Sequence, residues 1–251
     1  MSFSQFHAEV LAELDAIGRP QLAAHVPKDR RSDMEYSGVR VPDRRKLSRK
    51  GFSFSNRSES EVIAIWNDLF MRSPNGDVLF CALDYLRFRV PKRVSPDLWS
   101  IIREWVQRVD NWAHSDELSW IYSYVLEANF DEVLPDLIEW NKTNDLWPKR
   151  ISIVSLIHYT GKNAVFLTPG VMLPMVERCI DDHRYYMQKA TGWVLREMHR
   201  AYPNEIEEFL TTHLTHIGSD ALSRTVERMP QDRRGWWRDQ RKASLEHAGS
   251  D

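Results

Sequence analysis

The sequence has few of the features that indicate a disulfide framework, a membrane span or secretion. Its 251 residues include two cysteines, Cys81 and Cys179, each inside an apolar helical pattern. We expect both thiols to be buried and reduced, as in the cytoplasm. No apolar run approaches the roughly 20 residues that span a membrane, and residues 1–17 lack the basic start and apolar centre of a signal peptide. The expected location is therefore cytoplasmic.

The motifs of common enzyme classes are also missing. No C-x-x-C pair, phosphate-binding glycine loop, H-E-x-x-H helix or nucleophile elbow occurs. His213 and His216 stand three residues apart on a predicted helix, but two such residues without a nearby third are usually surface histidines. The sequence therefore predicts neither a metal site nor a cofactor.

Charge is present but segregated under a net value of −2. Residues 28–50 contain nine Lys/Arg against four acids, and residues 224–242 seven against three, whereas residues 115–145 contain eight acids and one lysine. Such patches suit a protein that presents a basic face to a polyanion, and solvated helix faces are the alternative. Pro42 suits the first turn of a helix, where Arg44, Arg45 and Lys46 would form an exposed cluster that attracts phosphate.

Apolar residues recur with helical spacing along almost the whole chain, and no alternating run indicates a strand. Helices are expected near 3–16, 22–26, 43–47, 58–70, 79–86, 95–109, 115–128, 131–142, 147–159, 171–181, 184–200, 204–214 and 219–228. Their pairing at roughly 35–45 residues predicts an all-α fold, an α-solenoid of HEAT-like helical hairpins. Residues 1–230 would form one domain, and residues 231–251 a polar, frayed tail.

A small set of polar and aromatic residues stands out against this helical background. Trp112 and Asp116 are four residues apart, so they lie on one helix face. Taken singly, Trp112 fits a core position and Asp116 an acid in a first helical turn, while Arg150 could pair with the acidic surface and Trp193 could pack beside Gly192. We expect Trp66, Trp99 and Trp105 to be buried, and Trp112 and Trp193 to expose an indole face.

The joint pattern resembles the alkylpurine DNA glycosylases of the AlkD type. The resemblance covers roughly residues 30–215 and is carried by four stretches in the same order. They are Gly38-Val39-Arg40-Val41-Pro42-Asp43-Arg44-Arg45, Trp112-x-x-x-Asp116, Leu146-Trp147-Pro148-Lys149-Arg150, and Gln188-Lys189-Ala190-Thr191-Gly192-Trp193-Val194-Leu195-Arg196-Glu197.

The resemblance implies a curved helical array that holds duplex DNA in a concave groove and excises positively charged N3- or N7-alkylated purines without metal or cofactor. It implies that Trp112 and Trp193 contact the deoxyribose of the lesion, and that Asp116 is the catalytic carboxylate. Arg150 would hold backbone phosphate. The further DNA-binding candidates are Lys149, Arg40, Arg44, Arg45, Lys46, Lys189 and Arg196, and the expected state is a monomer.

The residue chemistry agrees with this implication. An N-alkylated purine is already cationic and leaves without a general acid, so one carboxylate that stabilises the developing sugar cation is sufficient. No lysine is placed to form a Schiff base, so we expect base removal without strand cleavage. Two alternatives stay open: a non-catalytic helical-repeat DNA-binding module, and a protein-interaction scaffold.

Overall fold

The fold is all-α, as the apolar periodicity predicts. The structure is a computed structural model that describes residues 3–159 and 164–248. Within these residues it contains helices and two isolated β-bridges, but no β-strand. The helices divide into two compact units, residues 1–128 and residues 129–251. Each unit is described by itself.

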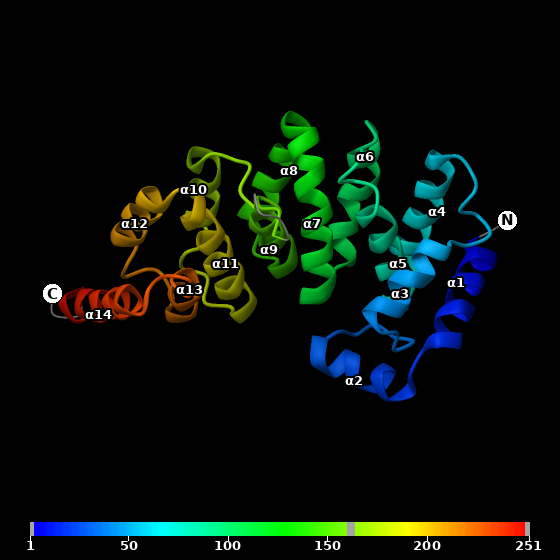
Figure 1. The fold of residues 1–251 in the computed structure, drawn as a ribbon, viewed down its shortest axis with the longest axis horizontal. Helices are drawn as coiled ribbons and strands as arrows, with labels where there is room; N and C mark the ends of the chain where they lie inside the picture. The colour runs from blue at the N-terminus through cyan, green and yellow to red at the C-terminus, as the bar shows by residue number, and fades with distance from the viewer. Residues whose placement is uncertain (1–2, 160–163, 249–251) are drawn as a thin grey trace. The chain divides into compact units, whose positions relative to one another are not determined.

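The first unit contains seven α-helices and one 3₁₀-helix, and α5 is its central helix (Figure 1). Every residue of α5 from Gly76 to Leu86 is buried, because α1, α3, α4 and α7 all pack against it. Ser58 and Glu61 form a reciprocal capping box that begins α4. The helices are α1 (Phe3–Ile17), α2 (Pro20–Arg30), α3 (Val41–Lys50), α4 (Glu59–Arg72), α5 (Gly76–Arg87), α6 (Leu98–Ile102), η1 (Arg103–Arg108) and α7 (Trp112–Ala128).

The second unit repeats this arrangement, with α11 in contact with α9, α10, α12 and α13. At Gly192, α11 and α13 pack closely, because an added Cβ would lie 2.4 Å from the carbonyl oxygen of Ala221 on α13. The helices are α8 (Phe130–Lys142), α9 (Leu146–Val154), α10 (Pro169–Glu177), α11 (Tyr185–Ala201), α12 (Pro203–Thr212), α13 (Ser219–Thr225) and α14 (Gln231–Ala248).

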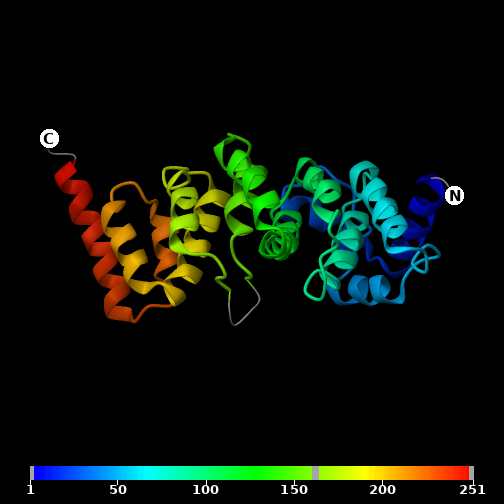
Figure 2. The same ribbon diagram turned by 90° about the horizontal axis from the view of Figure 1, so that it is seen from above.

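The expected frayed tail is wrong for residues 231–248. These residues form α14, a single continuous helix in Figure 2. Trp237 anchors it with an indole that is 1% exposed, and Arg241 Nε donates to the carbonyl oxygen of Ile217 at 2.8 Å. Other expected helices also differ at their ends. The one near 147–159 ends at Val154, and the one near 95–109 begins at Leu98 and becomes 3₁₀ after Ile102.

The expected core residues are buried. Trp66, Trp99 and Trp105 are each at most 2% exposed. Cys81 and Cys179 are both free and buried, and burial raises the pKa of these thiols to about 12 and about 11. In the part of the chain that the structure describes, no helix is long and apolar enough to cross a membrane.

Candidate active site

The first turn of α7 is held by an N-cap. Asn111, directly before Trp112, accepts hydrogen bonds through Oδ1 from the backbone N–H groups of Ala113 at 3.0 Å and His114 at 3.1 Å. Asparagine is preferred here because its side-chain oxygen satisfies N–H groups that have no intrahelical partner. Asn111 is fully buried. The cap therefore fixes the position of the turn that carries Trp112.

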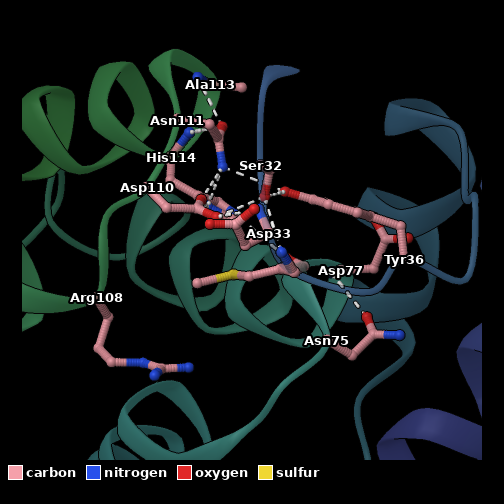
Figure 3. A network of polar contacts seen from close by, with 12 residues as sticks. Ser32, Asp33, Tyr36, Asn75, Asp77, Arg108, Asp110, Asn111, Ala113 and His114 are labelled. Carbon is pink, nitrogen blue, oxygen red and sulfur yellow. Dashed lines mark hydrogen bonds and ion pairs between the residues drawn. The ribbon is translucent and has the colours of Figure 1, made fainter. Parts of the chain in front are cut away.

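Hydrogen bonds tie this cap to the segment between α2 and α3 (Figure 3). Ser32 Oγ donates to Asp110 Oδ2 at 2.6 Å, and the backbone N–H of Asp33 donates to the same oxygen at 3.0 Å. Because Ser32 gives its only proton to the carboxylate, the Tyr36 hydroxyl, 3.0 Å away, donates to Ser32. Asn111 Nδ2 lies 2.6 Å from Asp110 Oδ1 and 3.2 Å from Tyr36 Oη. We define the α7 anchor as the side chains of Ser32, Tyr36, Asp110, Asn111 and His114.

His114 completes the α7 anchor in its neutral form. Nε2 lies 3.1 Å from the carbonyl oxygen of Gly76, which can only accept, so Nε2 carries the proton. Nδ1 then accepts from Asn111 Nδ2 at 2.7 Å. Burial lowers the pKa of His114, which favours this neutral state. Burial raises the pKa of Asp110, but contacts with His114, Ser32 and Asn111 outweigh it and hold that pKa well below its usual value.

Trp112 and Asp116 stand on the turns that the α7 anchor positions. Trp112 is 38% exposed, so the interpretation of this residue as part of the core is wrong. Asp116, one helical turn later, is half-buried. The structure therefore places an accessible indole and a partly desolvated carboxylate on neighbouring turns of one helix. A carboxylate in such a place has its charge less screened by water than one on an open surface.

The acid next to Asp116 is neutralised by two arginines. Glu117 accepts from Arg45 Nη2 at 3.0 Å and from Arg87 Nη1 at 2.6 Å, which links α7 to α3 and α5. Arg45 also pairs with Asp84, whose other oxygen accepts from Arg44 Nε at 2.8 Å. The negative charge of Glu117 is thus balanced within the first unit.

The expected exposed basic cluster at the start of α3 is wrong at Arg44. This side chain is 1% exposed, because it pairs with Asp84 and packs over the Phe80 ring at 4.2 Å. Arg40 and Lys46 are exposed as expected, with Arg40 paired to Asp43 at 2.9 Å. Only part of the cluster is therefore available to phosphate.

In the second unit, Trp193 is half-buried on α11, with its indole 4.9 Å from the Tyr159 ring. Lys189, one turn before it, is also half-buried, and its Nζ lies 5.1 Å from the Tyr185 ring centroid. Both aromatic contacts lie within this unit. They leave part of the Trp193 residue accessible.

The basic candidates Arg150, Lys149 and Arg196 are engaged inside the second unit. Arg150 is 3% exposed and donates to the carbonyl oxygen of Tyr186. Its guanidinium is therefore buried, contrary to expectation. Lys149 Nζ lies 3.7 Å from Asp182, and Arg196 pairs with Glu197 at 2.8 Å and also with Glu227. The burial of Arg150 therefore contradicts the expectation that this side chain holds backbone phosphate.

Comparison with known proteins identifies the family of the chain. Residues 10–229 match the family model described as DNA alkylation repair enzyme. The chain belongs to the DNA alkylation repair enzyme family. No curated protein sequence matches it. Among the described residues of this family member, no group of three or more His, Cys, Asp or Glu side chains is placed to hold a metal ion.

Solved structures share the fold of this DNA alkylation repair family member. The predicted DNA alkylation repair enzyme from Enterococcus faecalis has a TM-score of 0.70 at 15% identity, covering 85% of this chain and 97% of that one. AlkD2 from Streptococcus mutans has a TM-score of 0.60 at 13% identity, and the match covers 90% of this chain and 99% of that one. Smu.31 from Streptococcus mutans UA159 has a TM-score of 0.55 at 14% identity, and the match covers 84% of this chain and 98% of that one. The likeness extends over nearly the full length of each neighbour.

Two features of the first unit were not found from the sequence. The α7 anchor joins residues that are more than 70 positions apart, although Asn111 before a helical pattern is itself an N-cap signal. The other feature is the run Arg87-Phe88-Arg89-Val90-Pro91-Lys92-Arg93, whose density of cations is visible in the sequence.

Proposed function

We propose that this DNA alkylation repair enzyme is a monofunctional DNA glycosylase. Its substrates would be positively charged N3- or N7-alkylated purines in duplex DNA. The observation that carries the proposal is the accessible Trp112 indole, one helical turn before the half-buried carboxylate of Asp116, in a member of this family. The proposed reaction needs no group beyond the protein and water.

The proposed chemistry follows from the charge of the substrate. When the C1′–N bond breaks, its electron pair goes to the cationic purine, which leaves as a neutral base. Positive charge meanwhile develops on the sugar, where the Asp116 carboxylate stabilises it. Asp116 also orients a water molecule, whose oxygen bonds to C1′ while its proton is released to solvent. The products are a free base and an abasic site.

The indoles have a complementary proposed role. The face of Trp112 attracts a cation through its π-electrons, and this attraction strengthens as the sugar becomes positive. Trp193 on α11 is the second candidate, since part of its indole is accessible. The α7 anchor supports this role because it fixes the first turn of α7 through buried hydrogen bonds. Arg40 and Lys46 are exposed cations of the first unit that are suited to hold backbone phosphate.

The test is single-turnover release of 7-methylguanine from a duplex that contains one such lesion. Asp116→Asn keeps the side-chain shape and removes the charge, and we expect it to slow release by about 10²–10³, about 3–4 kcal/mol. Glu127→Gln, near the other end of α7, is the matched control and should release base at the wild-type rate. Trp112→Ala should weaken both binding and release, because it removes contact area as well as the attraction for the cation.

The outcomes separate the three functions. An Asp116→Asn variant as fast as wild type would show that this carboxylate is not catalytic. DNA binding by the wild type without any base release would favour the non-catalytic DNA-binding module. Absence of both would favour the scaffold.

A further inference from the structure

A second basic surface lies in the first unit, away from Trp112 and Asp116. It is a groove of about 870 Å³ between the C-terminal ends of α3 and α5 and the segment that follows each helix. We call it the basic groove. Glu59 is the one acid among its lining residues. The cations that line it are Arg49, Lys50, Arg87, Arg89, Lys92 and Arg93.

Most of these cations are not neutralised by acids. Arg87 pairs with Glu117, and Lys50 with Glu13 at 3.3 Å. In contrast, none of the other four has a carboxylate within ion-pair distance among residues 3–159 and 164–248. They are Arg49, Arg89, Lys92 and Arg93. Like charges gathered without counter-charges repel one another, so binding an anion there relieves repulsion as well as gaining attraction.

The chain holds these cations in place. After α5, the backbone N–H groups of Lys92 and Arg93 both donate to the carbonyl oxygen of Arg89, at 2.8 and 3.0 Å. Val90, within this turn, is buried and pins it to the core. A tight turn therefore presents three cations on one short segment, and little conformational freedom is lost when they bind a ligand.

The aromatic side chains of the groove indicate which part of a nucleic acid fits. The Arg89 guanidinium lies 3.6 Å from the centroid of the Tyr85 ring, and Arg49 lies 4.5 Å from that of Phe88. These ring faces are covered by guanidinium groups and are not open platforms on which bases could stack, as single-strand-binding proteins require. The groove suits the charged outer backbone of a duplex instead.

We propose that the basic groove binds phosphates of the duplex DNA backbone at a distance from the lesion. This inference rests on the proposed function only in taking duplex DNA as the ligand. Trp112 and Asp116 are not among the lining residues, so the groove adds affinity without touching the reacting sugar. Arg87 connects the two surfaces, because it lines the groove and also bonds to Glu117 on α7.

The test compares two triple variants of equal charge change on an undamaged duplex. Arg89→Gln/Lys92→Gln/Arg93→Gln alters the groove, and Arg72→Gln/Lys142→Gln/Lys242→Gln is the control on other surfaces. The logarithm of the affinity falls with the logarithm of the salt concentration, with a slope of roughly 0.9 per phosphate neutralised. We expect the groove variant to lower this slope by about 2–3 and the control by less than about 1. Thermal melting of both variants checks that they are folded.

The results separate this proposal from the proposed function. Equal losses in the two triple variants would show an effect of net charge alone and would overturn the groove. A groove variant that loses affinity only for a single-stranded probe would also overturn it. A loss confined to duplex affinity supports the groove even if the wild type releases no base, in which case only the proposed function fails. If the groove variant binds duplex DNA as tightly as wild type and still releases base, the groove proposal fails and the proposed glycosylase function stands.

Discussion

Asn111→Ala provides the most direct test of the α7 anchor. The substitution removes two N-cap hydrogen bonds, which typically costs about 1 kcal/mol. It also removes the two N–H groups of Asn111 Nδ2, which lies within hydrogen-bond distance of Tyr36, Asp110 and His114, and a buried polar group that loses its partner costs about 1–3 kcal/mol. We therefore expect the free energy of unfolding to fall by roughly 2–4 kcal/mol. Urea denaturation followed by circular dichroism measures it.

Two comparison variants separate the cap from the buried donor. Ser58→Ala removes the exposed capping box of α4, and we expect it to cost only about 1 kcal/mol. Asn111→Asp keeps the cap oxygen but loses both N–H groups and places a second carboxylate beside Asp110. It should be at least as unstable as Asn111→Ala. If Asn111→Asp were as stable as wild type, or if Asn111→Ala cost no more than Ser58→Ala, the buried network would not be what anchors α7.

Two further predictions concern packing and pH. Gly192→Ala should destabilise the protein by about 1–3 kcal/mol, because its Cβ would meet the carbonyl oxygen of Ala221. Gly235→Ala, with open space around it, should be neutral or stabilising by up to about 1 kcal/mol. Thermal melting measures both variants, and a lower melting temperature for Gly235→Ala than for Gly192→Ala would contradict this. His114 has a lowered pKa in the folded state, so the unfolded chain takes up the proton first. The free energy of unfolding should then fall as the pH drops below about 6.5, by at most about 1.4 kcal/mol per unit. Urea denaturation across this range should show a smaller slope for His114→Gln, and an unchanged slope would contradict the assignment.

The sequence predicted the helices well because their signals are local. An apolar stripe with helical period and a capping box, as at Ser58 and Glu61, need only neighbouring residues to be recognised. The ends were less accurate where tertiary packing decides them, as at Val154 and in α14, where burial of Trp237 keeps a polar sequence helical. The polar composition of residues 231–248 led to the prediction of a frayed tail, although one buried indole is enough to hold them as a helix.

The candidate site was predictable in its residue types but not in their surroundings. Trp112 and Asp116 were found because four-residue spacing on a helix implies a common face. The burial of Arg44 and Arg150 was not foreseen, because it depends on Asp84 and the carbonyl of Tyr186, which are 40 and 36 positions away. Pairing between distant residues leaves no periodic signal, so a charge run alone does not distinguish a cation that binds DNA from one that binds the protein's own acids.

The two buried cysteines have a consequence for the chemical durability of a repair enzyme. Agents that alkylate DNA are electrophiles, and they react with thiolates rather than thiols. Because burial raises the pKa of Cys81 to about 12 and that of Cys179 to about 11, both side chains are protonated thiols at pH 7. Burial also blocks the approach of the electrophile. Both cysteines are therefore poorly reactive, and we expect these two thiols to stay unmodified when the protein is exposed to an alkylating agent.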